Sequence, residues 1–222
     1  MDKYILRKEY FGGIIADVNN FCVNSVDKIQ YEAIKELRKI KNDSHVNVYE
    51  CETHDNVLSA PTSSTIYPSL KCNSDCEFCF VKSIEGKYRF DMTYKEFCEC
   101  VDKLKLVGVI DIEIMGGEPL LIPWILDGIL YIANNGMHVS INTNAILLDD
   151  MMLNRLGMIE NLSLRISIQD GFDSLPSYIL QMLEICKKQS IRIDILSVLQ
   201  KKNCDKLIEL LRCLPKEIVK NL

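Results

Sequence analysis

The fold of this chain is decided by the stretch Tyr67-Pro-Ser-Leu-Lys-Cys72-Asn-Ser-Asp-Cys76-Glu-Phe78-Cys79-Phe80. Its three cysteines have the spacing CxxxCxxC, and an aromatic residue stands just before the third. A short loop can turn three such thiolates onto one inorganic centre more readily than a helix or a strand can. The stretch therefore predicts a metal or cluster site.

Two kinds of centre compete for these thiolates. Structural zinc takes four ligands, usually as two Cys or Cys/His pairs. No second pair follows at that spacing, and the nearest histidine, His54, lies upstream among polar residues. Iron–sulfur clusters are also held by closely spaced cysteines, normally four. Three ligands would leave one iron open, and an open position distinguishes catalytic from structural metal sites. From the loop alone, a zinc or redox-active cysteine site stays the alternative.

Length and charge narrow the class of protein. The 222 residues suffice for one sizeable domain, with or without a small appendage. The net charge of −5 offers no basic footprint for nucleic acid. No charged-then-apolar leader opens the chain and no apolar run could cross a bilayer, so we expect a cytoplasmic protein without membrane contact. In that reducing compartment the ten cysteines are expected to be thiols or ligands.

Strand and helix patterns alternate from Thr65 onward. Strands separated by helices pair in parallel through right-handed crossovers. We therefore expect an α/β fold, a partial (β/α) barrel truncated after its fifth strand–helix unit, with its chemistry at the carboxyl ends of the strands. The expected strands are residues 65–70, 111–115, 138–142, 163–168 and 192–198, and the expected helices are residues 94–106, 123–134, 149–156, 175–188 and 204–214.

The N-terminal residues show a different pattern of strands and helices from the rest of the chain. Residues 4–17 are β-rich with a glycine pair, Asn19-Asn20 marks a turn before a short apolar run, and residues 28–41 have apolar residues at helical spacing. We expect a small β-β-α module over residues 1–58 and the barrel over residues 59–222. So short a module cannot bury a core alone and should pack on the barrel.

Three further strand ends carry glycine or polar residues. The second expected strand runs into Met115-Gly116-Gly117-Glu118-Pro119, the third into Ile141-Asn142-Thr143-Asn144, and the fourth into Ser167-Ile168-Gln169-Asp170-Gly171. Glycines let the backbone approach another group closely. Because loops after parallel strands gather at one end of a barrel, these loops should lie near the cysteine loop.

Together the four strand ends resemble those of the radical S-adenosylmethionine (radical SAM) enzymes. The cysteine loop with Phe78 looks like the cluster motif of that family, and residues 116–119 look like its GGEP motif. Asn142-Thr143-Asn144 and Ser167 resemble its later strand ends. Ala145 departs from the family pattern, which commonly has glycine there. Gln169 stands where an acid is expected, which leaves Gln169 and Asp170 unassigned.

The resemblance implies that Cys72, Cys76 and Cys79 bind a [4Fe-4S] cluster, with S-adenosylmethionine on its open iron. The implied activity is reductive cleavage of S-adenosylmethionine to a 5′-deoxyadenosyl radical, which abstracts hydrogen from a substrate. No side chain is assigned a catalytic role, and a flavodoxin or ferredoxin is the implied electron donor. The implied cofactor contacts are Phe78, Gly116, Gly117, Glu118, Pro119, Asn142, Asn144 and Ser167.

The N-terminal segment carries a second resemblance. Tyr4-Ile-Leu-Arg with Phe11-Gly12-Gly13 resembles the small PqqD-type precursor-recognition module found ahead of radical SAM enzymes that modify ribosomally made peptides (RiPPs). It implies a peptide maturase whose substrate is a precursor peptide. Two alternatives stay open: the hairpin has no binding role, or the whole chain is a truncated or non-catalytic cluster-, SAM- or peptide-binding protein that acts with a partner chain completing the barrel.

Other chemically interesting residues are expected to be structural. Cys98 and Cys100 are two apart on an expected helix and face different ways. His138 begins a strand and is expected to be solvent-facing or hydrogen-bonded rather than catalytic, and the sequence shows no Ser/His/Asp constellation. The cysteines expected to pack as small apolar residues are Cys98, Cys100, Cys186, Cys204 and Cys213.

Overall fold

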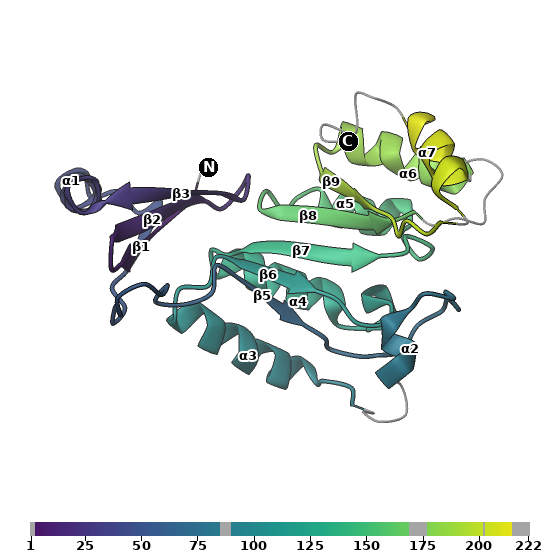
Figure 1. Cartoon of the computed structure of the whole chain (residues 1–222), viewed down its shortest axis with the longest axis horizontal. Coiled ribbons are helices and arrows are strands. Elements are labelled where there is room, and N and C mark those ends of the chain that lie inside the picture. The colour runs from purple at the N-terminus through teal and green to yellow at the C-terminus, as the bar shows by residue number, and fades with distance from the viewer. Residues whose placement is uncertain (1–2, 85–89, 169–176, 202, 215–222) are drawn as a thin grey trace.

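The computed structural model describes residues 3–84, 90–168, 177–201 and 203–214. These residues form two sheets, one of four strands in the order β3-β2-β1-β4 and one of five strands in the order β5-β6-β7-β8-β9. Figure 1 shows the four-stranded sheet at one end of the five strands, and the helix that follows the cysteine loop, α2 (Phe80–Ile84), at the other.

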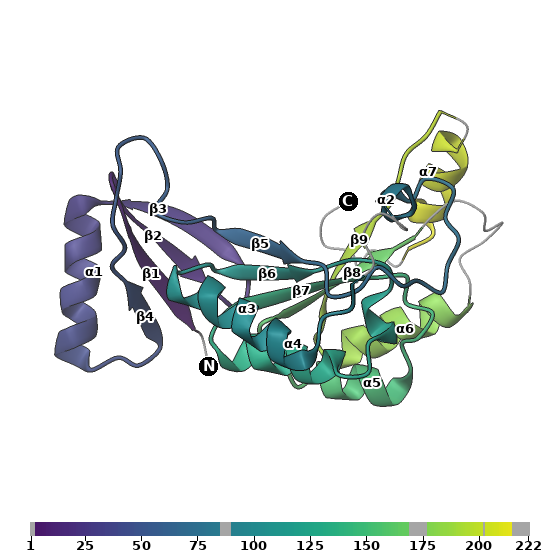
Figure 2. The same ribbon diagram turned by 90° about the horizontal axis from the view of Figure 1, so that it is seen from below.

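The five-stranded sheet is parallel throughout, which confirms the expected α/β class. Helices follow its strands in turn, and Figure 2 shows α3, α4, α5 and α6 along one face. The strands are β5 (Ser63–Ile66), β6 (Asp111–Ile114), β7 (His138–Thr143), β8 (Leu162–Ser167) and β9 (Arg192–Leu196). The helices are α3 (Tyr94–Leu106), α4 (Ile125–Asn134), α5 (Asp150–Leu156), α6 (Ser177–Lys188) and α7 (Cys204–Arg212).

The predicted end of the first strand, residues 65–70, is wrong. β5 stops at Ile66, because the next residues bond to other segments instead of continuing along β6. The Pro68 carbonyl accepts from Met92 N, and the Ser69 carbonyl accepts from Gly117 N. Proline also lacks the N–H that a central ladder needs. The chain therefore leaves the sheet before it reaches the cysteines.

The two faces of the sheet differ in chemistry because side chains alternate along a strand. Ile112, Ile114, Val139 and Ile141 are buried in the main core with the helices. The opposite face, here called the polar face, is lined by Ser63, Thr65, Asp111, Glu113, His138, Ser140, Asn142, Ser163, Arg165, Ser167, Arg192 and Asp194. The face toward the helices thus contributes to the apolar core, and the opposite face is available for polar contacts.

The N-terminal module has more strands than the sequence predicted. Residues 4–17 form two antiparallel strands rather than one, and a short strand after the helix was not predicted, so the order is β-β-β-α-β and not β-β-α. This last strand pairs in parallel with β1, so its partner is supplied by distant sequence. The elements are β1 (Tyr4–Glu9), β2 (Gly12–Asp17), β3 (Cys22–Asp27), α1 (Lys28–Lys41) and β4 (Val46–Tyr49).

Helix α1 packs through a different side than its spacing indicated. Tyr31 is its buried residue, and its ring lies over Gly13, where a Cβ would collide with it. Ile29 and Leu37 of the expected apolar stripe are instead 83% and 53% exposed. The helix therefore keeps an apolar surface outside the module.

The module packs on the part of the chain that holds the five-stranded sheet, as so short a segment requires. Ile110, which precedes β6, belongs to the module's own core. Arg7 is fully buried and donates to the carbonyl oxygens of Ala60 (2.7 Å), Pro61 (2.9 Å) and Gly108 (2.8 Å). Its Nε also donates to Glu9 at 2.8 Å. Within the described residues, no helix is both long and apolar enough to cross a membrane.

Candidate functional site

The cysteine loop lies between β5 and α2. Cys72 is exposed, and Cys76 and Cys79 are partly buried. The loop is partly self-bonded: Cys79 N donates to the Cys76 carbonyl at 3.3 Å, and Ser74 N donates to Cys72 Sγ at 3.4 Å. Burial raises the pKa of the Cys76 thiol, and the charges of Cys79 and Cys72 raise that pKa further, so the three thiols are electrostatic neighbours.

The thiols do not converge on one point. Across the described ranges, no group of three His, Cys, Asp or Glu side chains is placed to hold a metal ion. The fit to an iron–sulfur cluster therefore rests on the donor set, because three neighbouring thiols in one short loop are the ligands that such clusters take.

The glycine pair after β6 approaches the chain's own backbone. Gly117 N donates to the Ser69 carbonyl at 3.1 Å, and Glu118 N donates to the Lys71 carbonyl at 2.8 Å. Gly116 has a φ of +135°, and a Cβ on Gly116 or Gly117 would overlap the carbonyl oxygen of Ser69 or Lys71. Only glycine fits such an approach. The pair therefore fixes the segment that leads into Cys72.

Glu118 joins the ends of β6 and β7. Its carboxylate is nearly fully buried and accepts from Leu120 N at 3.0 Å, Thr143 Oγ1 at 2.8 Å and Asn144 N at 2.9 Å. Burial raises the pKa of Glu118, while these three hydrogen bonds pull the pKa back down. The carboxylate is thus largely satisfied by the protein itself.

Asn144 extends this connection to the cysteine loop. Its Nδ2 donates to Asn73 Oδ1 at 2.8 Å and Ser74 Oγ at 3.0 Å, and its Oδ1 accepts from Ile146 N at 3.1 Å. Ala145 has a φ of +62°, which explains why the family commonly has glycine there. Glu118 and Asn144 together tie two strand ends to the loop between Cys72 and Cys76.

The other expected cofactor residues lie around the same end of the sheet. Asn142 is on the polar face, and its Oδ1 is buried without a hydrogen-bond partner in the described part of the chain. Ser167 ends β8 and is partly buried, as is Phe78 in the loop. Pro119 is buried at the start of a 3-10 turn. Gln169 and Asp170 lie outside the described residues. The orphaned Asn142 oxygen is the feature that best fits a ligand.

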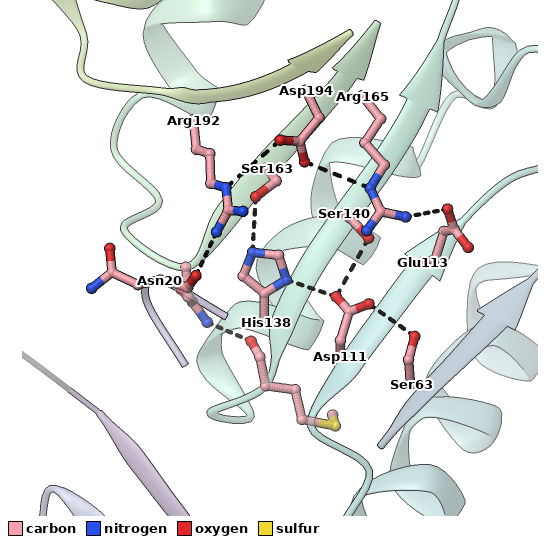
Figure 3. Close-up of polar contacts among 12 residues, drawn as sticks. Asn20, Ser63, Asp111, Glu113, His138, Ser140, Ser163, Arg165, Arg192 and Asp194 are labelled. Carbon is pink, nitrogen blue, oxygen red and sulfur yellow. Dashed lines mark hydrogen bonds and ion pairs between the residues drawn. The ribbon is translucent and has the colours of Figure 1, made fainter. Parts of the chain in front are cut away.

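The polar face also holds a connected set of side chains that sequence analysis missed (Figure 3). His138 Nδ1 lies 2.6 Å from Asp111 Oδ1, and His138 Nε2 lies 3.0 Å from Ser163 Oγ. Asp111, His138 and Ser163 therefore form a Ser/His/Asp arrangement, and the expectation that none exists is wrong. All three residues are 1% exposed, so no substrate reaches Ser163. Of the two expectations for His138, hydrogen-bonded is confirmed and solvent-facing is wrong.

A sequence signal for this set did exist. Fully buried parallel strands normally read as continuous apolar runs. Here polar residues recur at every second position in three successive strands. The positions are 111 and 113, then 138, 140 and 142, then 163, 165 and 167. Such a pattern indicates a parallel sheet with one polar face.

Toward the cysteine-loop end, the polar face becomes partly exposed. The side chain of Arg165 is 23% exposed, pairs with Glu113 and lies 3.8 Å from Asp194. These charges come from β8, β6 and β9, and Figure 3 shows them on one side of the sheet. On the three middle strands, the face is therefore buried at the module end and partly exposed toward the loop.

The remaining cysteines are mostly packed, as expected. Cys186 is buried, and burial raises the pKa of its thiol to about 12. Cys98, Cys100 and Cys204 are partly buried, whereas Cys213 is exposed, contrary to expectation. None of them lies in the cysteine loop.

The parallel α/β sheet and the two motifs at its strand ends define the class of protein. Residues 66–213 match the model of the Radical SAM superfamily. The chain belongs to this superfamily, whose members use a [4Fe-4S] cluster and S-adenosylmethionine.

Three proteins illustrate what the chain is similar to. Sporulation killing factor maturation protein SkfB of Bacillus subtilis (strain 168) is 30% identical over 115 residues, which are 51% of this chain and 27% of SkfB. GTP 3′,8-cyclase of Clostridium botulinum (strain Hall) is 34% identical over 113 residues, 47% of this chain and 35% of that protein. The crystal structure of Streptococcus suis SuiB bound to precursor peptide SuiA shares the fold, with a TM-score of 0.71 at 21% identity over 96% of this chain and 60% of SuiB. The chain thus spans well under half the length of SkfB and of the GTP 3′,8-cyclase.

Proposed function

We propose that this chain is a radical SAM enzyme that abstracts hydrogen from a ribosomally made precursor peptide. The observation that carries the proposal is the tie from two strand ends to the cysteine loop. Glu118 accepts from Asn144 N, and the Asn144 side chain bonds to Asn73 and Ser74. Superfamily motifs that are far apart in sequence thus meet around one loop with three thiols.

In this proposal, each group of residues has its own task. Cys72, Cys76 and Cys79 hold the cluster, and the bound cluster with S-adenosylmethionine supplies a 5′-deoxyadenosyl radical. The Asn142 oxygen, which has no partner among the described residues, can accept a hydrogen bond from the cofactor. The proposed cofactor contacts are Phe78, Gly116, Gly117, Glu118, Pro119, Asn142, Asn144 and Ser167; Gly116, Gly117, Glu118 and Asn144 also hold the loop.

Residues 1–58 are proposed to capture the peptide by strand addition. β3 is an edge of its sheet, and residues 22–25 are exposed. An edge strand offers unpaired N–H and C=O groups, which take up an extended peptide with little demand on its sequence. The exposed Ile29 and Leu37 of α1 add apolar surface nearby. A peptide substrate agrees with the maturation role of SkfB and with the peptide bound to SuiB.

Anaerobic reconstitution tests the proposal. The protein should take up about four irons and four sulfides and, with a flavodoxin or ferredoxin system as electron donor, release 5′-deoxyadenosine. Cys72→Ala, Cys76→Ala and Cys79→Ala combined should abolish both. The matched control combines Cys98→Ala, Cys100→Ala and Cys204→Ala, which should leave the iron content unchanged. Full iron content in the first variant would exclude the assigned ligands.

A non-catalytic role with a partner chain is the second candidate. β9 is the last strand in the order of its sheet, so within the described residues its outer edge has no strand partner. A partner chain could pair there. In that case the reconstituted protein should bind S-adenosylmethionine in calorimetry but release 5′-deoxyadenosine only after the partner is added.

A further inference from the structure

We infer that the protein fixes its peptide-capturing edge and its cysteine loop at opposite ends of β7. A captured peptide would then have to extend across about 20 Å, roughly six residues, before one of its side chains reaches the loop. This inference rests on the proposed function and adds a spacing requirement to it. Its basis is a pair of side-chain contacts, one at each end of the same strand.

At the N-terminal end of β7, the ring of Phe21 stacks on the ring of His138. The ring centroids are 5.0 Å apart and the planes differ by 15°. Phe21 has a φ of +47°, a conformation that is unfavourable for an aromatic residue and needs support from its surroundings. Asp17 supplies this support, because its carboxylate accepts from Asn19 N (3.0 Å), Asn20 N (3.2 Å) and Asn20 Nδ2 (2.8 Å).

The surface beneath Phe21 is equally fixed. Both ring nitrogens of His138 are bonded, one to Asp111 and one to Ser163, so the ring cannot rotate without breaking a buried hydrogen bond. Arg192 of β9 donates to the Asn20 carbonyl beside it, as Figure 3 shows. Since Phe21 directly precedes β3, these contacts set the start of the proposed capturing edge.

A second attachment prevents the module from pivoting about Phe21. Arg7 of β1 is bonded to the carbonyl oxygens of Ala60, Pro61 and Gly108 with no solvent exposure. Two separate attachments, Phe21 just before β3 and Arg7 in β1, define one orientation of the module. The edge of β3 therefore has a fixed position relative to the barrel strands.

The C-terminal end of β7 is connected to the cysteine loop by hydrogen bonds. Asn144 follows the last residue of the strand and donates to Asn73 and Ser74. From His138 to Asn144 there are six residue steps, which at about 3.3 Å each give about 20 Å. The strand itself thus sets the separation of the two contacts. The partly exposed charges of Glu113, Arg165 and Asp194 on neighbouring strands offer polar contacts along the way.

The first experiment tests the separation without any peptide. Cys22, next to Phe21, and Cys72 in the loop are both exposed thiols. A long bismaleimide, reaching about 30 Å or nine extended residues, should join them, whereas a short one reaching about 10 Å should not. Peptide mapping by mass spectrometry identifies the pair. Efficient joining by the short reagent would overturn the inference.

The second experiment tests the peptide's path. The probe is the short peptide encoded beside the gene of this chain, with a photoreactive residue placed three, six or nine residues beyond the segment that binds the module. Labelling of residues 71–80 should rise about tenfold between the three- and six-residue spacers, because the effective concentration is near zero when a tether cannot span the distance. Equal labelling with all spacers would overturn the inference.

A matched pair of variants completes the test. Phe21→Ala removes the contact with His138, one of the two attachments, so the module can pivot about Arg7, and labelling by the three-residue spacer should rise above that of the parent. Phe11→Ala removes another partly buried ring of the same module, one that lies against Tyr10, and should keep the threshold. If the peptide binds neither protein, the proposed capture fails, while the bismaleimide experiment still decides the separation.

Discussion

Asn144 connects more of the site than any cysteine does. Its backbone N–H donates to Glu118, its side-chain Nδ2 donates to Asn73 and Ser74 in the cysteine loop, and its side-chain Oδ1 accepts from Ile146 N. No substitution of similar size provides all of these contacts. At this position the protein holds the loop in place before any ligand is bound.

We expect Asn144→Ala to loosen the loop without unfolding the protein. Two side-chain hydrogen bonds to the loop are lost, each contributing roughly 0.5–1.5 kcal/mol. The reconstituted variant should lose iron to a chelator several times faster than the parent. Asn154→Ala, which removes an exposed contact to Gln189 on the helical side, serves as the control. Equal rates of iron loss in both variants would contradict a role for Asn144 in holding the loop.

Ala145 illustrates how a family difference is accommodated. Its φ of +62° is a left-handed conformation that costs roughly 1–2 kcal/mol for a residue with a Cβ. Ala145→Gly should therefore change the free energy of unfolding by no more than about 1 kcal/mol, since relief of strain offsets the lost methyl group and the added chain entropy. Ala145→Val should destabilise by clearly more, because a branched side chain fits that conformation poorly. Urea unfolding of both variants compares them; a Val variant as stable as the Gly variant would refute this account.

At the scale of elements, strand β3 is the part of the module that is proposed to act. Neighbouring residues in an edge strand alternate, so that one N–H points into the sheet and the next points away from it. Proline removes that N–H and is tolerated only where it points outward. The pair Asn24 and Ser25 therefore contains one position of each kind.

We expect Asn24→Pro and Ser25→Pro to behave oppositely. One variant should lose stability, because it breaks a bond to β2. The other should melt like the parent but bind the labelled precursor peptide at least about tenfold more weakly, because it blocks strand addition. Fluorescence polarisation measures binding and circular dichroism measures melting. A stable variant with unchanged peptide affinity would argue against capture at this edge.

At the scale of the whole molecule, the module and the five-stranded sheet with its helices should unfold together. Arg7 is buried at the junction, and its removal would leave Glu9 buried without its cation. Breaking a buried pair in this way costs about 3–5 kcal/mol. Arg7→Ala should therefore lower the stability of the single unfolding transition by that amount. Arg155→Ala, at an exposed pair with Asp127, should change it by about 1 kcal/mol or less. Two separate transitions in the parent would contradict the joint behaviour.

The sequence predicted what is encoded locally. The spacing of Cys72, Cys76 and Cys79 is contained within eight residues, and the capping box of Thr93 with Glu96 that begins α3 lies within four, so both were predictable. The contact of Phe21 with His138 was not, because it depends on how two distant segments pack. β4 was missed because a four-residue strand with Asn in it carries little periodic signal. The loop tie through Asn144 likewise became visible only once the strands were in register.

The burial of Arg7 has a consequence for the order in which the protein can mature on the ribosome. The five strand and helix segments of the module emerge early, but the carbonyl groups that accept from Arg7 belong to Ala60, Pro61 and Gly108. Ile110, which completes the module's core, comes later still. Although N-terminal domains generally fold first during synthesis, this one cannot bury Arg7 with its hydrogen bonds satisfied until the start of β6 has left the exit tunnel. A pause in translation before that point would expose a half-formed sheet with open edges to chaperones and proteases.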